Sequence, residues 1–277
     1  MIRALEIFVG MAGILAVVLP HRSRPAWKSA ALLVGCSVLL VDGVMPWAQQ
    51  LFGGTLSDED EALVGGGLSL VGTLFALMVG FVVVVVWQSV SDTESTVARE
   101  ANALSDLERM SRGFQVEIRR QVHEAARTYA RLVIAEEWPA MANNKTSARA
   151  NAALVELWNV YTTIRPAEQA THLFAQSLVR LNELGDARRA RLLAATSRVP
   201  AVMWLLIAAD ALAIIAMSFA YGLSEAWQVR LLMAAMVGTV AFAIFLVAEL
   251  DGPFSGDLCV GPEPFELFLD GMQQIES

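Results

Sequence analysis

Five stretches of this chain are apolar enough to cross a lipid bilayer, and they constrain its fold more than any other feature. They cover residues 2–19, 27–47, 62–90, 199–221 and 231–248. A hydrocarbon core of about 30 Å takes about 20 helical residues. The sequence therefore predicts an all-α polytopic membrane protein, with three spans before a long polar segment and two after it.

The first stretch has a second interpretation, because a short apolar run near the start of a chain can be a signal peptide. Arg3 and Glu6 lie in its opening turn, and Arg22 and Arg24 follow it. A signal peptide has its positive charge before the apolar run and a small-residue cleavage site after it. We favour a retained helix, and removal of this first span stays open.

The positive charge predicts the topology. Residues 91–199 hold fifteen of the twenty basic residues, whereas the loop with Asp58, Glu59, Asp60 and Glu61 holds none. Short loops rich in Lys and Arg stay cytoplasmic. We expect the amino terminus outside, and the middle segment and the carboxyl terminus inside.

This topology predicts four parts. Residues 1–90 carry spans one to three, residues 91–198 form a cytoplasmic helical bundle that continues from span three, residues 199–249 carry spans four and five, and residues 250–277 form a cytoplasmic tail with Pro and Gly and a short amphipathic helix. The bundle is predicted from apolar residues that recur every three or four positions.

Local signals predict the ends of the bundle helices. No turn signal follows Val90, so span three is expected to continue as a long helix, with a possible break at Gly113. The helix that follows should end near Trp138 and Pro139, because proline disfavours helical geometry in the residue before it. Thr146 or Ser147 can cap a second helix, and a third is expected to begin at Pro166.

The residues that carry most enzyme chemistry are sparse. The three histidines lack metal-ligand spacing, and Gly65, Gly66 and Gly67 lack the ending of a phosphate-binding loop. Residues 91–199 carry thirteen acidic residues against the fifteen basic ones, too even a balance for nucleic-acid binding. We expect no enzyme, no cofactor, no metal and no nucleic-acid partner.

Span three carries two features of possible function. Gly72, Ala76 and Gly80 form a seam of small residues that would let another helix approach, either span two of the same chain or span three of a second copy. The run from Phe81 to Val86, with Val84 and Val85, would make an apolar constriction if copies surrounded an axis. It could equally face lipid.

Two carboxylates and a basic run lie in or beside the spans. Asp42 in span two and Asp210 in span four either mark an ion or proton path or serve packing in a protonated or hydrogen-bonded form. Arg188, Arg189 and Arg191 precede span four, where they would bind anionic headgroups, line a vestibule or hold the topology.

The carboxyl tail is the most distinctive stretch of the sequence. Its prolines and glycines predict an irregular path after span five, and the acidic amphipathic helix that follows should pack on the bundle rather than lie on the membrane. Its motif residues are Glu249, Asp251, Pro253, Phe254 and Gly256.

Four elements together resemble the bacterial bestrophin-like domain family. They are the ELDGPFSGDL tail, Glu136 to Pro139 after Tyr129, Glu100 with Ala101, and the run from Arg188 to Arg191. The resemblance covers about residues 65–270. Gly252 stands where relatives often have a basic or polar residue. The resemblance implies kinship to bestrophins, which are oligomeric anion channels with apolar constrictions, and a place in the bacterial inner membrane.

The leading functional hypothesis is therefore an oligomeric ion channel whose span three lines the path. Anion selectivity follows from the resemblance alone, because the membrane carboxylates do not favour it. The expected partners are the lipid bilayer, other copies of the chain and ions. The alternative is a membrane-anchored scaffold or sensor whose helical bundle binds a protein partner.

Overall fold

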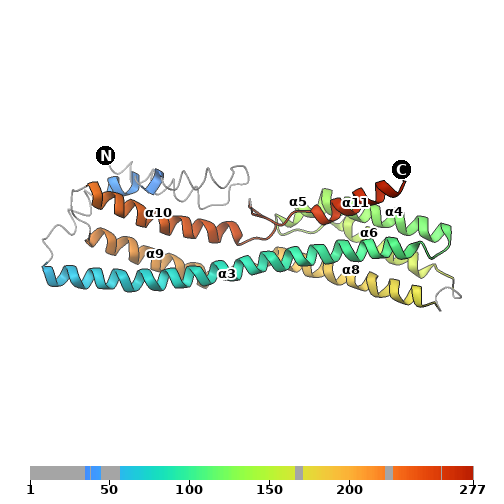
Figure 1. The fold of residues 1–277 in the computed structure, drawn as a ribbon, viewed down its shortest axis with the longest axis horizontal. Helices are drawn as coiled ribbons and strands as arrows, with labels where there is room; N and C mark the ends of the chain where they lie inside the picture. Colours follow the sequence, from blue (N-terminus) through green and yellow to red (C-terminus); the bar gives the residue numbers. More distant parts are fainter. Residues whose placement is uncertain are drawn as a thin grey trace. The chain divides into compact units, whose positions relative to one another are not determined.

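The computed structural model describes residues 35–37, 39–44, 57–165, 171–221, 227–256 and 258–276, and every regular element in these ranges is helical. The prediction of an all-α fold is confirmed (Figure 1). In chain order the elements are α3 (Asp58–Ser111), α4 (Val116–Leu132), the π-helix η1 (Val133–Glu137), α5 (Trp138–Met141), α6 (Ala148–Thr162), α8 (His172–Thr196), α9 (Ala201–Tyr221), α10 (Trp227–Leu250) and α11 (Glu263–Glu276).

The chain divides into two compact units. Unit 1 takes the described residues of Met1–Trp87, Arg198–Asp251 and Gly256–Leu258. Unit 2 takes the described residues of Gln88–Ser197, Gly252–Ser255 and Cys259–Ser277. The carboxyl tail thus contributes to both units.

Helix α3 is a single helix of 54 residues (Figure 1). It confirms the predicted continuation of span three beyond Val90, and it ends at Ser111, just before Gly113. An added Cβ on Gly113 would collide with the end of the Leu173 side chain, so a larger residue there would require that side chain to move. The break predicted there is where α3 gives way to the turn before α4.

Among the described residues, three stretches are long and apolar enough to cross a bilayer: Ala62–Ser111, His172–Phe219 and Trp227–Leu250. The first two begin in one unit and end in the other, and the third lies in unit 1. They contain predicted spans three, four and five. Predicted span one lies outside the described residues. Of span two, residues 35–37 and 39–44 are described, and these are helical.

The described core of unit 1 joins three helices. Leu40 and Val41 of the span-two segment pack with Phe219 of α9 and Met233 and Val237 of α10. Gly238 of α10 also approaches the span-two segment, because an added Cβ there would meet the hydroxyl of Ser37 at 3.2 Å. These contacts are the close packing of small and apolar residues that holds helices together in lipid.

Unit 2 is a helical bundle in which consecutive helices run antiparallel around an apolar core. Leu104 and Leu107 of α3, Val122 of α4, Leu157 of α6 and Leu184 of α8 are completely buried. Helix α6 begins where its cap was predicted, because the Ser147 hydroxyl accepts a hydrogen bond from the N–H of Ala150 at 3.2 Å.

One predicted helix end differs from the structure, and another lies outside the described residues. The helix expected to end near Trp138 and Pro139 continues to Met141. It does so through the π-turn of η1, after which Pro139 occupies the first turn of α5, a position that tolerates the missing N–H. The predicted start at Pro166 lies outside the described residues, and the helix that follows begins at His172 with Thr171 as its cap.

Helix α11 packs on unit 2, as predicted. Phe265, Phe268 and Met272 of its apolar face are buried. The Phe265 ring meets the Tyr129 ring edge-on, with 6.5 Å between the centroids. The apolar face of this acidic helix is thereby buried against other parts of the protein.

Candidate functional site

One face of α3 in unit 1 remains uncovered. Phe81, Val84 and Val85, the predicted constriction, are exposed by 70%, 62% and 54%. The opposite face is buried through Phe75, Val79, Val82 and Val86. The described chain therefore covers α3 on one side and leaves large apolar side chains on the other, for lipid or for a second copy to cover.

The small-residue seam of α3 is open as well. Ala76 and Gly80 are exposed, and a Cβ added to Gly72 or Gly80 would meet no atom within 4 Å. Among the described glycines of α3, Gly67 is one that another helix approaches closely. A Cβ added there would meet the terminal methyl of Met217 on α9 at 2.6 Å. The seam is thus available to another helix.

The two predicted membrane carboxylates lie in different surroundings. Asp42 is about half exposed, and its carboxylate lies 3.8 Å from the Arg230 guanidinium of α10. Asp210, on α9, is partly buried. No contact in the described chain brings the two together as one site.

The centre of unit 2 holds a buried cluster of charges, which we call the charged core: Glu100, Tyr129, Glu137, Arg188 and Arg191. Arg191 of α8 donates from Nε and Nη2 to the two carboxylate oxygens of Glu100 on α3, at 2.6 and 2.9 Å. Its Nη2 also donates to Glu137 of η1 at 2.8 Å. Glu100, Glu137 and Arg191 are completely buried.

Arg188 completes the charge balance. It donates to Glu137 from Nη2 at 2.6 Å and from Nε at 3.2 Å, and its Nη1 donates to Asn151 of α6 at 2.8 Å. Two guanidinium groups thereby neutralise two carboxylates. Burial of ions costs free energy unless each charge is paired and hydrogen-bonded, and here every charge is.

The ionisation of the charged core follows from these contacts. Burial, and then the Glu100 carboxylate, raise the pKa of Tyr129 well above its ordinary value. The Tyr129 hydroxyl donates to Glu100 at 2.5 Å. Burial alone would raise the pKa of Glu137, but Arg188 and Arg191 hold that pKa below its ordinary value. The cluster thus keeps Tyr129 neutral and favours the ionised form of Glu137.

Aromatic rings connect the charged core to the tail. The Trp138 indole N–H donates to the carbonyl of Val260 at 3.1 Å, and the Trp138 ring meets the Phe254 ring edge-on, with 5.4 Å between the centroids. The guanidinium carbon of Arg191 lies 5.3 Å from the Trp138 ring centroid and 6.0 Å from that of Phe265. The tail of unit 2 is therefore held against the same residues that hold Arg191.

The basic run before α9 is divided between interior and surface. Arg188 and Arg191 are buried in the charged core, whereas Arg189 is exposed and pairs with Asp186. From the sequence, all three were expected to be juxtamembrane charges that bind anionic headgroups, line a vestibule or hold the topology. In the structure, the charges of Arg188 and Arg191 are directed to carboxylates.

The charged core was not predicted, although its members carry the resemblance. The sequence did carry a signal for this cluster, because some charged residues occupy positions within the apolar stripes of α3 and α8. Arg188 and Arg191 continue the buried series of Leu181 and Leu184, and Glu100 lies between buried Val97 and Leu104. An ionisable residue at such a position needs a buried partner of opposite charge.

The tail motif has a local role at the end of α10. The N–H of Val199, just before α9, donates to the Asp251 carboxylate at 2.5 Å, and Arg198 donates to the carbonyl of Asp251 at 3.3 Å. Burial raises the pKa of Asp251 against these two contacts. Gly256 has φ of +92°, and a Cβ there would lie 2.7 Å from the Glu249 carboxylate.

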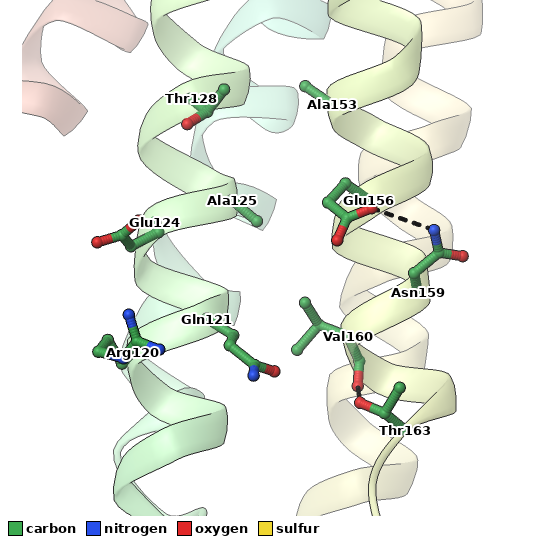
Figure 2. Close-up of a pocket in the computed structure, with 10 residues that line it drawn as sticks. All are labelled: Arg120, Gln121, Glu124, Ala125, Thr128, Ala153, Glu156, Asn159, Val160 and Thr163. Carbon is green, nitrogen blue, oxygen red and sulfur yellow. Dashed lines mark hydrogen bonds between the residues drawn. The ribbon is translucent and has the colours of Figure 1, made fainter.

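A groove of about 560 Å³ separates α4 and α6 on unit 2. Figure 2 shows Gln121 of α4 and Glu156 of α6 pointing into it from opposite sides. Ala125 and Ala153 also line it. Within the described ranges, no three His, Cys, Asp or Glu side chains gather as a metal site requires.

One family model matches most of the chain. A model of the Bestrophin-like domain matches residues 35–265. No curated protein matches the sequence.

Solved structures share the fold. A bacterial bestrophin homologue from Klebsiella pneumoniae is 16% identical with a TM-score of 0.63, covering 88% of this chain and 94% of that one. A point variant of this homologue is 15% identical with a TM-score of 0.65, covering 97% and 99%. Another structure, described as a point variant of a membrane protein, is 16% identical with a TM-score of 0.64, covering 88% and 96%. This chain belongs to the Bestrophin-like domain family.

Proposed function

We propose that the protein is the subunit of an ion channel in the bacterial inner membrane, with α3 lining the ion path. The observation that carries this proposal is the uncovered apolar face of α3 opposite a buried one. Membership of the Bestrophin-like domain family and the fold shared with bacterial bestrophin homologues support it. Copies of the chain would cover this face by surrounding an axis.

In this proposal the two units have different roles. Phe81, Val84 and Val85 form the apolar constriction, and the seam of Gly72, Ala76 and Gly80 receives a neighbouring helix. Unit 2 lies in the cytoplasm as the inner mouth, with the amino terminus outside and the carboxyl terminus inside. The charged core makes that mouth rigid, because it ties α3 to α8 and η1.

Conductance tests the proposal directly. Purified protein in planar bilayers should give discrete currents, and detergent-solubilised protein should elute as an oligomer. A strict monomer, or silence across salts and voltages, would exclude α3 as a shared pore helix. A reporter fused near residue 150 should report a cytoplasmic position.

The alternative function is a membrane-anchored scaffold or sensor. The groove between α4 and α6 favours it, because an open groove lined by both apolar and polar side chains suits a protein side chain or short segment. A scaffold requires a stoichiometric partner, which crosslinking from native membranes should recover. The substitution Glu156→Arg should abolish that recovery without changing conductance.

A further inference from the structure

The groove between α4 and α6 holds a carboxylate that has no cation beside it. Glu156 points into the groove (Figure 2), and its Oε2 accepts a hydrogen bond from the Asn159 amide at 3.2 Å. Within the described chain, the other oxygen, Oε1, accepts no hydrogen bond, and Glu156 forms no ion pair. A negative charge with a free acceptor oxygen therefore faces the groove.

Gln121 contributes a second acceptor from the opposite side. Its amide nitrogen donates to the Glu117 carboxylate at 3.0 Å, on the surface of α4. A glutamine amide has one donating and one accepting end, so the end left for the groove is the carbonyl oxygen. Figure 2 shows this side chain reaching toward α6. The two helices thus present acceptors to the same space.

The positive charge at this groove is already paired. Arg120 is the basic residue among those that line it, and its guanidinium donates to Glu117 from Nη2 at 2.7 Å and from Nε at 3.3 Å. Glu124, also at the groove, points away from α6 in Figure 2 and adds a further negative charge. The groove is therefore negative overall, and it offers more acceptors than donors.

The remaining lining is apolar and short. Ala125, Ala153 and Val160 are exposed by less than a tenth, and the two alanines leave room between the helices. The volume of about 560 Å³ lies in the range of small-molecule sites. A metal ion does not fit this lining, because no three His, Cys, Asp or Glu side chains gather anywhere in the described ranges. An occupant needs positive charge, N–H donors and an apolar body.

We propose that this groove binds a small organic amine. The ammonium group lies between Glu156 and Gln121, where its N–H groups find both free acceptors. Its alkyl body lies against the two alanines and Val160. The inference goes beyond the proposed function, because a protein that carries no current can still bind the amine. It also differs from the scaffold alternative, in which a partner protein fills the groove.

Butylamine is a suitable probe at neutral pH, where it is protonated. Titrated into the purified chain in uncharged detergent and followed by saturation-transfer NMR, it should bind saturably. Butanol has the same alkyl body without the charge and should bind at least about tenfold more weakly. Glu156→Gln should weaken butylamine binding by about tenfold or more, and Gln121→Leu by about three- to tenfold.

Glu94→Gln is the matched control, because it removes an exposed carboxylate of α3 that does not line the groove. It should bind butylamine as the wild type does. All three variants should keep the wild-type melting temperature without amine, since their side chains are at least partly exposed. A loss of binding then reports on the groove and not on the fold.

Three results would overturn the inference. They are absence of saturable binding to the wild type, equal binding of butylamine and butanol, and an equal loss in Glu94→Gln and Glu156→Gln. None of them bears on the conductance of the protein or on the recovery of a protein partner, so failure here and failure of the proposed function are distinguishable.

Discussion

Arg191 and Glu100 form a bidentate ion pair across 91 positions of sequence, with N–O distances of 2.6 and 2.9 Å, and neither side chain is exposed. The pair joins α8 to α3 in the interior of unit 2. Its removal should therefore affect the whole unit.

Loss of one partner from this pair should be more damaging than loss of both. Arg191→Met leaves Glu100 buried without its cation, which typically costs about 3–5 kcal/mol. The double variant Glu100→Leu with Arg191→Met removes both charges and should recover much of that loss. Thermal unfolding in detergent, followed by circular dichroism, measures the difference. Equal losses in the single and double variants would contradict this account.

High pH should weaken the fold through Tyr129. Its pKa is raised above the ordinary value of 10, so the folded state holds the proton more tightly than the unfolded chain does. The stabilisation is complete below pH 10 and is lost as the pH rises through the folded-state value. The melting temperature of wild type should fall more steeply above pH 10 than that of Tyr129→Phe. Melting temperatures that fall in parallel in the two proteins would exclude Tyr129 as the source of the loss at high pH.

Trp138 should control how firmly the tail is held. Trp138→Phe removes the hydrogen bond to Val260 but keeps a ring, and should cost about 0.5–1.5 kcal/mol. Trp138→Ala also removes the contacts with Phe254, Phe265 and Arg191 and should cost about 3–5 kcal/mol. Limited proteolysis should then cut between residues 252 and 262 at a rate that rises from wild type to Trp138→Phe and again to Trp138→Ala. Cleavage rates that are equal in all three would show that the tail is held elsewhere.

Gly256→Ala should destabilise the tail motif by about 1–2 kcal/mol, because its positive φ is unfavourable for any residue with a Cβ. The contact with Glu249 adds to this loss. Gly271→Ala in α11 is the control. There an added Cβ meets nothing within 4 Å, and alanine favours the helix by about 0.5–1 kcal/mol. Thermal unfolding should give shifts of opposite sign.

Phe75 and Phe81 provide a matched pair on α3. Phe75 is buried, so Phe75→Ala should cost about 3–5 kcal/mol of stability. Phe81 is mostly exposed, and under the proposed function Phe81→Ala should widen the constriction and raise the single-channel conductance with little change in melting temperature. A conductance that stays unchanged in Phe81→Ala would place this side chain against lipid.

Much of the helical architecture could be predicted because its signals are local. The apolar run after Ala62, the cap at Ser147 and the stripe of Phe265, Phe268 and Met272 all depend on neighbours within a few residues. The helix expected to end near Trp138 and Pro139 continues to Met141, because the π-turn places the proline in a first turn that tolerates its missing N–H.

The sequence by itself determined that the chain is helical, membrane-associated and of the Bestrophin-like domain family, because length, hydropathy and short motifs are properties of contiguous residues. Only the tertiary structure decided that Glu100, Glu137, Arg188 and Arg191 share one buried site. Their pairing depends on helix packing over long separations in sequence. A charge on a helix reveals its partner only when that packing brings the two together and excludes water.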